Sequence, residues 1–564
     1  MTEHKSTSDL NVNMADARVS MTRTRTSAGD LVSVDENDPQ PTPKDLRFWM
    51  VFLAVCASLF LSALEFTVVS SALPTIIHDL NGTEFSWIPS AYSLASTALL
   101  PASGGFAQIF GRRATILASL AMFALGSALC GAAKTSNWLI AARTVQGAGG
   151  GGILSLGSII VSDMVTLQER GTYNGFIGMT WALASGIGPV IGGALASSGQ
   201  WRWIFYLNLP ICGVAAALVI VFLDLPTPPG SLKNKLRRVD WIGNAIIIAS
   251  SSSCLLALTW GGVTFPWVSV HVLLPLILGL LGSGIFLIYE ALVAKEPIVP
   301  YSLFKNRTSL GGYIQTFIVP MITIPMIYFV PVYFQACKGA SPLRSGVLSL
   351  NLCLSLAPGL LATGISIARS HRYRPQIWAG WILQIVSAGA MTTVHADTPV
   401  SHAVGLPTVG AVGSGILYAG TYFPVLAPLP VTDNAHALAF FSFCRSLAGA
   451  WGISIGTSIL QTQLGQRLPA EFMAKFPEGV SAAYAIIPLI PTLEEETRNQ
   501  VRFAFAESLI VVWQVLIGIS GIGLVASLFM KGLPLHTDID RKWVIDRAQG
   551  VQETEMQNAQ MVDP

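Results

Sequence analysis

The sequence predicts an all-α integral membrane protein with about 14 transmembrane helices. Hydrophobic residues make up 52% of its 564 residues and charged residues only 11%, whereas soluble proteins carry about 25% charged residues. A soluble chain of this length would need far more charge to cover its surface. The composition therefore excludes a soluble enzyme, a secreted disulfide scaffold and a disordered protein. The net charge of +2 gives no indication of nucleic acid as a partner.

Apolar stretches long enough to cross a bilayer, which takes about 20 residues, recur from Phe48 onward. They lie near 48–72, 88–110, 114–133, 138–161, 173–196, 203–223, 241–260, 270–292, 309–334, 346–367, 376–394, 404–429, 435–460 and 507–530. Residues 1–47 are polar, and we expect a disordered cytoplasmic tail there. Residues 531–564 are expected to form a second cytoplasmic tail. We interpret the seven scattered cysteines as small buried hydrophobic residues.

The distribution of Lys and Arg predicts the orientation of the chain in the membrane. With the N-terminus inside, 13 of these residues fall in short inner loops and four in short outer loops. An even number of spans then places the C-terminus inside too. Residues from about 462 to 506 become a long outer loop. Asn81 begins a glycosylation sequon, Asn81-Gly82-Thr83, in the first outer loop.

The sequence lacks the motif that an ATP-driven pump needs. A phosphate-binding P-loop requires a Gly-Lys pair, and the chain contains none. The glycine run Gly149–Gly152 lies in an apolar span, where small residues let helices pack closely. The eight histidines show no metal-binding spacing, and we expect no metal, no cofactor and no enzymatic activity. A secondary transporter or a channel remains, with a non-transporting sensor as an alternative.

Two ionisable residues lie inside predicted spans, where charge is costly and indicates function. Glu65 lies about 25 Å above the inner end of the first span, and Arg143 about 8 Å below the outer end of the fourth. In a hydrocarbon core of about 30 Å the two residues lie at similar depth. Arg143 would keep Glu65 ionised, whereas burial alone would favour the protonated carboxyl. Glu65 and Arg143 are therefore candidates for proton coupling, and a static ion pair that fixes helix packing is the alternative.

Further polar residues in the spans are candidates for a central substrate cavity. Arg445 lies near the middle of the thirteenth span, and we expect it to face a wet cavity, an anion or carbonyl groups. Substrate contact and purely structural contact are both open for it. The other candidates are Gln146, Gln315, Asn351, Tyr418 and Tyr422. Each of these could instead form a hydrogen bond between helices.

Four segments, in order along the chain, resemble the motifs of the major facilitator superfamily, specifically its drug:H⁺ antiporters with 14 spans. The segment Gly104–Arg113 is similar to the loop between spans two and three, and Arg143–Gly152 to the fourth-span motif. Gly186–Gly193 resembles the antiporter motif of the fifth span. Trp201–Pro210 resembles the signature of the 14-span branch. The resemblance extends from about Trp49 to Met530.

This resemblance implies two six-helix halves, related by a pseudo-twofold axis, with a substrate site between them. We assign residues 48–224 and 309–530 to the halves, and 225–308 to a linker with two extra spans. The resemblance implies a cytoplasmic gate and a helix kink, the latter through Gly188-Pro189. The gate residues are Gly104, Gln108, Gly111, Arg112 and Arg113, with Asp163 as a further candidate, and the kink residues are Gly186, Gly188, Pro189, Gly192 and Gly193.

The chain departs from the family pattern at two positions. Gln108 stands where the family has Asp, so we expect a weaker gate or a neutral hydrogen bond. Glu65 also replaces an Asp, which keeps the charge on a longer side chain.

The segments Ser71–Ile76, Asp240–Asn244, Pro331–Gln335 and Gly339–Pro342 resemble those of filamentous-fungal members of the family. This resemblance implies the function. We expect a proton antiporter in the plasma membrane that exports a hydrophobic small molecule, such as a toxin or drug, by alternating access. Siderophore uptake or the loading of amino acids into a vacuole is the alternative, and it allows a vacuolar membrane. The expected partners are the substrate, protons and the lipid bilayer, and we expect a monomer.

Overall fold

The structure is a computed structural model, and it describes residues 44–80, 87–225, 228–262, 265–469 and 487–535. Residues 50–564 form one compact unit by their contacts, and residues 1–49 form another. The predicted glycosylation site Asn81 and nearly all of both predicted tails lie outside the described residues.

The described residues are helical and contain no β-strand, which confirms the all-α prediction. The first group comprises α1 (Leu46–Leu80), α2 (Trp87–Phe110), α3 (Arg112–Gly131), α4 (Ser136–Met164), α5 (Leu167–Ser197), α6 (Trp203–Tyr206) and α7 (Asn208–Phe222). The linker comprises α8 (Leu232–Arg238), α9 (Trp241–Trp260), α10 (Val270–Leu292) and α11 (Ser302–Lys305).

The second group begins with three long helices, α12 (Arg307–Lys338), α13 (Pro342–Ser370) and α14 (Arg374–Met391). It continues with α15 (Val400–Gly420), α16 (Tyr422–Leu426), η1 (Val431–Asp433), α17 (Asn434–Arg467), η3 (Ile487–Thr492) and α20 (Glu495–Leu528). Thus α17 and α20 reach into the segment that we predicted as an outer loop, 462–506, and its residues 470–486 lie outside the described part.

Each predicted span coincides with a helix or with a pair of consecutive helices. Twelve candidate spans in the described part of the chain are both long enough and apolar enough to cross a membrane. The remaining two predicted spans correspond to α2 and α14, which do not meet both criteria. The protein is therefore a multi-pass membrane protein, and the count of 14 spans stays a prediction.

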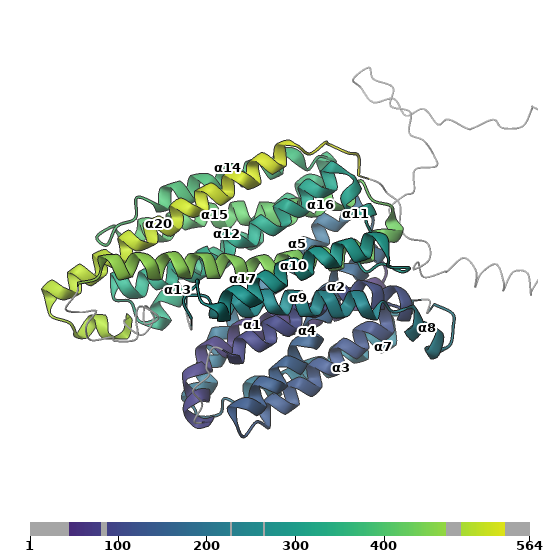
Figure 1. Cartoon of the computed structure of the whole chain (residues 1–564), viewed down its shortest axis with the longest axis horizontal. Helices are drawn as coiled ribbons and strands as arrows, with labels where there is room; N and C mark the ends of the chain where they lie inside the picture. The colour runs from purple at the N-terminus through teal and green to yellow at the C-terminus, as the bar shows by residue number, and fades with distance from the viewer. Residues whose placement is uncertain (1–43, 81–86, 226–227, 263–264, 470–486, 536–564) are drawn as a thin grey trace, which may run out of the picture. The chain divides into compact units, whose positions relative to one another are not determined.

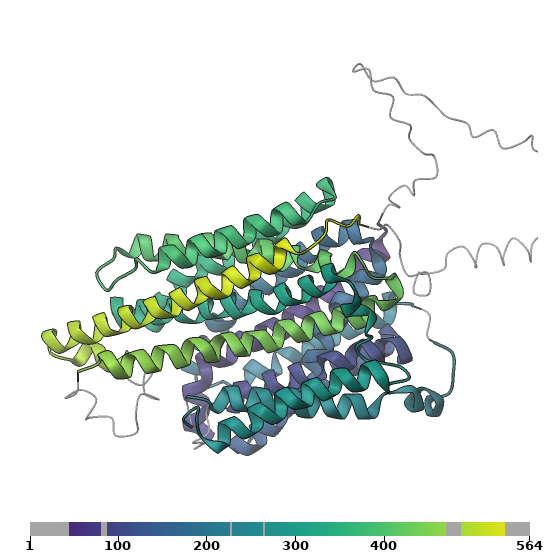
Figure 2. The same cartoon turned by 45° about the horizontal axis from the view of Figure 1, so that its top comes forward.

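The long helices run alongside one another in two groups, with α9 and α10 against them (Figures 1 and 2). The two groups meet chiefly where α2 packs against α17 and where α5 packs against α13. The linking helix α9 packs on both α2 and α17. The linker therefore touches the same two helices that join the groups.

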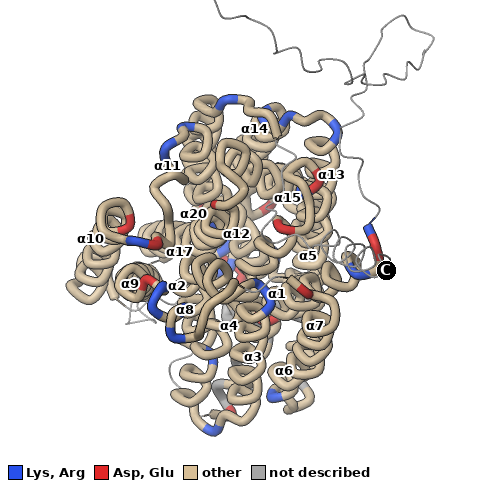
Figure 3. Tube along the Cα trace, turned by 90° about the vertical axis from the view of Figure 1, so that its right-hand side faces the viewer, with Lys and Arg blue, Asp and Glu red and all other residues tan. Residues whose placement is uncertain are grey.

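One end of the bundle carries α8, α11 and most of the Lys and Arg residues that the view in Figure 3 shows in blue. We call it the basic end, and the opposite one the far end. At the basic end the two groups touch through their backbones. The position that a Cβ atom on Gly364 of α13 would take is 2.1 Å from the main-chain oxygen of Gly171 in α5. A Cβ on Gly104 of α2 would lie 2.8 Å from the oxygen of Ala435 in α17. The interface is thus closed at this end.

The glycines of α4 allow close helix packing, as the sequence predicts. A Cβ atom on Gly147 would lie 2.3 Å from the main-chain oxygen of Tyr92, and one on Gly151 would lie 2.3 Å from that of Ser96. Both oxygens belong to α2. Any larger side chain would push α4 away from α2, because interiors of this density have no room for extra atoms.

We expect Gly151→Ala to lower the free energy of unfolding by about 1–3 kcal/mol, the usual cost of overpacking. The measurement is the melting temperature of the purified protein in detergent. Gly213→Ala in α7 is the matched control, because no atom lies within 4 Å of its Cβ position. That control should be neutral or stabilising by up to about 1 kcal/mol, since Ala favours helix over Gly. Equal losses in both variants would contradict the packing argument.

Candidate functional site

Glu65 and Arg143 form a buried ion pair between α1 and α4. Nη1 of Arg143 donates directly to Oε1 of Glu65, and neither side chain is more than 2% exposed. The structure thus brings together the two residues that the depth estimate placed at the same level. An ion pair that is buried away from water needs further hydrogen bonds to offset the free energy lost on desolvation.

Amide side chains supply those hydrogen bonds. Nδ2 of Asn208, the first residue of α7, donates to Oε2 of Glu65 at 2.7 Å. Nη1 of Arg143 also donates to Oε1 of Gln146 at 2.7 Å, and Nε of Arg143 donates to the main-chain oxygen of Ile88 at 3.1 Å. Each carboxylate oxygen therefore has its own donor, one on a cation and one on a neutral amide.

The network extends to α3 and is bordered by aromatic rings. Nε2 of Gln146 donates to Oγ of Ser127 at 2.8 Å. The guanidinium carbon of Arg143 lies 4.5 Å from the centre of the Tyr92 ring and 5.9 Å from that of Phe205. Such cation–π contacts stabilise a desolvated cation. Gly150 leaves room for Tyr92, because its Cβ atom would lie 2.4 Å from the Tyr92 hydroxyl.

Three members of this network did not appear among the sequence candidates. Asn208 lies within the segment Trp201–Pro210 that carries the family resemblance, so the sequence offered a reason to select it as a candidate. Tyr92 and Ser127 held none, because uncharged polar residues are common in membrane helices.

The candidates for a substrate cavity do not converge on one place. Gln146 belongs to the Glu65 network. Gln315 is buried within the second group, where its Oε1 accepts from Trp381 Nε1 at 2.9 Å and its Nε2 donates to the main-chain oxygen of Gly311. Asn351 joins α13 to α15 by donating to the oxygen of Val404 at 2.7 Å. For Gln315 and Asn351 the contacts are those of helix–helix hydrogen bonds.

Arg445, Tyr418 and Tyr422 do lie together, at the meeting of α15, α16 and α17. The guanidinium carbon of Arg445 is 4.1 Å from the Phe441 ring centre and 4.7 Å from that of Tyr418. Its Nη2 donates to the main-chain oxygen of Tyr418. The Tyr422 ring packs on Phe441, with ring centres 5.7 Å apart. Within the described residues Arg445 forms no ion pair with a carboxylate, and its buried Nε has no partner.

The predicted gate is built around Arg112 at the basic end. Nε of Arg112 donates to Oδ2 of Asp163 at 2.8 Å, and both side chains are buried. Asp163 at the end of α4 thus pairs with a residue of the predicted gate, and its part in the gate stays a prediction. Gln108 reaches the other group of helices, because its Nε2 donates to the main-chain oxygen of Thr432 at 3.1 Å. The expected neutral hydrogen bond is present across the interface.

Arg113 and Gly111 complete the turn of the gate motif, and the Arg113 side chain is partly exposed. Arg113 donates to the main-chain oxygen of Ile220 at 2.7 Å and lies 3.8 Å from Oδ1 of Asp224. Gly111, the residue before α3, has a φ of 90°, a conformation that favours glycine. It allows the tight turn between α2 and α3 that presents Arg112 and Arg113.

The fifth-span motif brings α5 close to α1. A Cβ atom on Gly188 would lie 2.1 Å from Oγ1 of Thr67, two residues after Glu65. One on Gly186 would meet only Leu350, at 3.8 Å, and one on Gly193 would meet nothing within 4 Å. Gly192 and Pro189 lie in the same helix, which is unbroken from Leu167 to Ser197. The kink stays a prediction, and close packing beside Glu65 is what the motif provides here.

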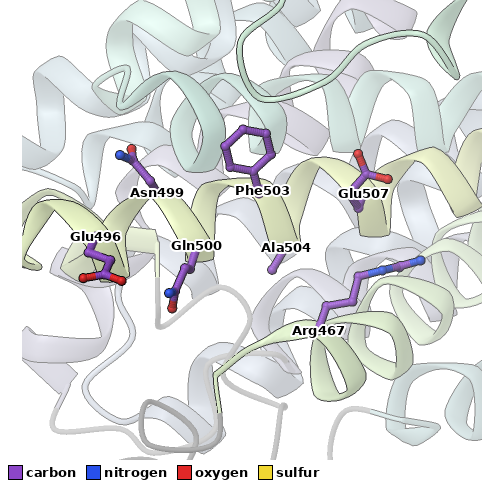
Figure 4. Close-up of a pocket in the computed structure, with 7 residues that line it drawn as sticks. All are labelled: Arg467, Glu496, Asn499, Gln500, Phe503, Ala504 and Glu507. Atoms are coloured by element: carbon purple, nitrogen blue, oxygen red, sulfur yellow. The ribbon is translucent and has the colours of Figure 1, made fainter.

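A cavity of about 550 Å³ lies at the far end, between the ends of α17 and α20. Its lining residues are Arg467, Glu496, Asn499, Gln500, Phe503, Ala504 and Glu507 (Figure 4). None of them belongs to the Glu65 network or to the Arg445 cluster. The cavity is therefore separate from the predicted sites.

Comparison with known proteins matches residues 55–453 to the Major Facilitator Superfamily. The MFS-type efflux pump LUC4 of a Fusarium species is 39% identical over 529 residues, 92% of this chain and 94% of the relative. Efflux pump FUS6 of Gibberella moniliformis is 38% identical over 518 residues, covering 90% and 92%. The MFS-type transporter of the acurin A biosynthesis cluster in Aspergillus aculeatus is 35% identical over 520 residues, covering 90% and 94%.

Solved structures show the same fold at low sequence identity. The human organic anion transporter MFSD10 superposes with a TM-score of 0.54 at 15% identity, covering 86% of this chain and 100% of the other. The proton:xylose symporter XylE superposes with a TM-score of 0.51 at 14% identity, covering 87% and 98%.

Asp163→Asn should lower the free energy of unfolding by about 3–5 kcal/mol, because it breaks a buried ion pair. Asp224→Asn is the matched control, since it breaks the exposed contact with Arg113, where the loss should stay below about 1 kcal/mol. Thermal unfolding of the two purified variants measures the difference. Similar melting temperatures would show that the Arg112–Asp163 pair does not stabilise the basic end.

Proposed function

The chain belongs to the major facilitator superfamily and is an efflux transporter, and we propose that it exports a hydrophobic small molecule in exchange for protons. The observation that carries the coupling is the Glu65 carboxylate, buried in α1 and held by Arg143 and Asn208. A buried carboxylate poised between a cation and a neutral donor can bind and release a proton as its surroundings change.

Protonation of Glu65 would change the contacts between helices. A neutral carboxyl is a much weaker partner for Arg143 than a carboxylate. Arg143 would then depend on Gln146, on the oxygen of Ile88 and on the Tyr92 ring. α1 and α4 could shift relative to one another, and Gly188 beside Thr67 would carry the shift to α5. The proton thereby favours one of two arrangements of the helices, which is what alternating access requires.

We place the basic end in the cytoplasm, because Lys and Arg concentrate in cytoplasmic loops. Both termini are then cytoplasmic, and the plasma membrane is the site of export. The closed contacts Gly171–Gly364 and Gly104–Ala435 then seal the cytoplasmic side of the interface. The far end would be the side of release in this arrangement.

The substrate class follows from the relatives. One relative is named for a biosynthesis cluster, that of acurin A, and others are named efflux pumps. We therefore propose a secondary metabolite or toxin as the cargo. Arg445, with Tyr418 and Phe441 stacked against it, would contact the substrate, because it combines apolar rings with donors that have no carboxylate partner. No relative named above is described as an uptake or vacuolar carrier.

The function is tested by deleting the gene in the organism of origin and comparing cells and medium by mass spectrometry. A compound that accumulates in the cells and disappears from the medium identifies the substrate. We then expect wild-type protein in liposomes to move that compound against its gradient when a pH gradient is imposed. An unchanged pattern of metabolites, and unchanged sensitivity to added drugs, would contradict export.

Glu65→Gln should reduce proton-driven transport at least 100-fold, because the amide cannot take up or release a proton. Glu65→Asp keeps the charge and should retain part of the activity. Uptake of the identified compound, with and without the pH gradient, measures the loss. The control is Glu296→Gln, which removes an exposed carboxylate at the basic end and should leave transport unchanged. Undiminished gradient-driven transport by Glu65→Gln would exclude this carboxyl as the coupling group.

Arg445→Gln should raise the KM for export by about tenfold or more, since it removes the charge and the stacked guanidinium. Arg445→Lys keeps the charge and loses the planar fork, so an intermediate KM is expected. Initial rates per molecule of folded protein give KM and kcat separately. A lower melting temperature with unchanged KM in both variants would assign Arg445 a structural role only.

A further inference from the structure

Two neighbouring carboxyl groups lie in the linker, remote in sequence from Glu65, and each has one buried oxygen atom. Asp240 caps α9, and Glu290 lies in the last turn of α10, where it is 4% exposed. Gly243 has no side chain, and this leaves room for both carboxyl groups. The position that its Cβ atom would take is 2.3 Å from Oδ2 of Asp240 and 2.6 Å from Oε1 of Glu290. These two carboxylate oxygens therefore lie close to the same point beside Gly243. Figure 3 shows acidic positions next to α9 and on α10 at the basic end.

The other oxygen of each carboxyl group is already engaged. Oδ1 of Asp240 accepts from the main-chain N–H of Gly243 at 2.9 Å and from the hydroxyl of Tyr289 at 3.0 Å. Oε2 of Glu290 accepts from the main-chain N–H of Val299 at 3.1 Å. Oδ2 and Oε1 are buried, and neither has a hydrogen-bond donor in the described part of the chain. Each carboxyl thus turns its unpartnered oxygen toward the other.

No cation among the described residues neutralises this pair. Arg238 is the nearest candidate in the sequence, and it is engaged with Glu296 through two hydrogen bonds of 2.7 and 2.8 Å. His436 of α17 donates to the main-chain oxygen of Ile298 at 2.9 Å and not to either carboxyl. The charged and titratable groups of the surrounding segments are Lys233, Lys235, Arg237 and Arg238 before α9, Tyr289, Lys295, Glu296, Tyr301, Lys305 and Arg307 around the end of α10 and after it, and Asp433 and His436 at the start of α17.

Two adjacent carboxylates cannot both remain ionised in a buried place, because like charges at this separation repel strongly. A single proton between them removes one charge and provides the missing hydrogen bond for both unpartnered oxygens. We propose that Asp240 and Glu290 bind one shared proton, which makes the linker a second proton-binding site. This proposal does not depend on transport or on the role of Glu65.

The site is connected to the interface between the two groups of helices. Glu290 holds Val299, and the neighbouring Ile298 is bound by His436 of α17. Ser302 donates to Oδ2 of Asp433 in η1, just before α17, at 2.7 Å. Loss of the proton would drive Asp240 and Glu290 apart and loosen this segment from α10. A change of pH at the basic end would therefore alter the contacts of this segment with α17. Because α17 packs on α2, the change would reach the interface between the two groups of helices.

The test is the melting temperature of the full-length protein in detergent between pH 6 and pH 8.5. In the unfolded chain Asp and Glu lose their protons at about pH 4, so a proton shared by the two side chains at neutral pH would be bound by the folded state alone. The state that binds more protons is favoured as the pH falls. Wild-type stability should therefore rise as the pH falls, by up to tenfold in the unfolding equilibrium constant for each pH unit.

Glu290→Gln imitates the protonated side chain, because its amide can donate to Oδ2 of Asp240. It should remove this pH dependence and melt above the wild type at pH 8.5. Asp240→Asn should do the same, since its amide oxygen can still cap α9. Glu296→Gln is the control and should keep the wild-type slope. Repeating the series in a His436→Gln background separates any titration of that imidazole.

Variants of Glu290 and Asp240 that keep the wild-type slope, or that melt below the wild type at every pH, would overturn the proposal. So would a wild-type melting temperature that responds to Na⁺ or K⁺ concentration and not to pH, because the occupant would then be a metal cation. Since no substrate is needed, failure of this test leaves proton-coupled export untouched, and failure of export leaves this site untouched.

Discussion

The burial of Glu65 against Arg143 is the constraint on which the first group of helices depends. A charge pair inside a membrane protein is tolerated only if both partners are fully hydrogen-bonded. Four helices meet that requirement, since α1 provides Glu65, α4 provides Arg143 and Gln146, α3 provides Ser127 and α7 provides Asn208. A motion that separates α1 from α4 breaks this ion pair and is easier once a charge has been neutralised. The proton binding proposed for Glu65 would provide that neutralisation without an additional partner.

The chain compensates for its missing family carboxylate at the gate. Gln108 cannot form an ion pair, and Arg112 instead pairs with Asp163 of α4 within the same group of helices. The contact across the interface is left to a neutral hydrogen bond from Gln108 to Thr432 and to backbone contacts between glycines. A neutral hydrogen bond contributes about half as much as a charged one. The closed state at the basic end is thus held mainly by packing, which allows it to open without separating a buried charge pair.

Composition and charge were sufficient to predict the helical membrane fold, because every span must be long and apolar. Charge also made Glu65, Arg143 and Arg445 visible, since such residues are rare in spans. Asn208 and Tyr92 could not be found in this way, because a neutral polar residue is equally suited to a site and to a helix contact. For the same reason Gln315 and Asn351 could not be placed. Which face of a helix they occupy depends on the packing of α12, α13 and α15, and sequence hydropathy does not report it.

The placement of α4 explains how the proposed coupling pair and the predicted gate can act together. Arg143 and Asp163 lie about 30 Å apart on this one helix, at 1.5 Å per residue. Between them, the glycine run lets α4 pack directly against the backbone of α2, with Gly147 and Gly151 next to main-chain oxygens.

A helix packed this tightly moves as a rigid body and not by bending, because close-packed interiors transmit displacement. A shift that begins at the Glu65–Arg143 pair must then move Asp163, and with it Arg112, at the opposite end of the bundle. The same rigid contact carries α2, which holds Gln108 at the interface with Thr432. The proposed proton site and the predicted gate would therefore be linked through one helix pair, and no separate signalling element would be required.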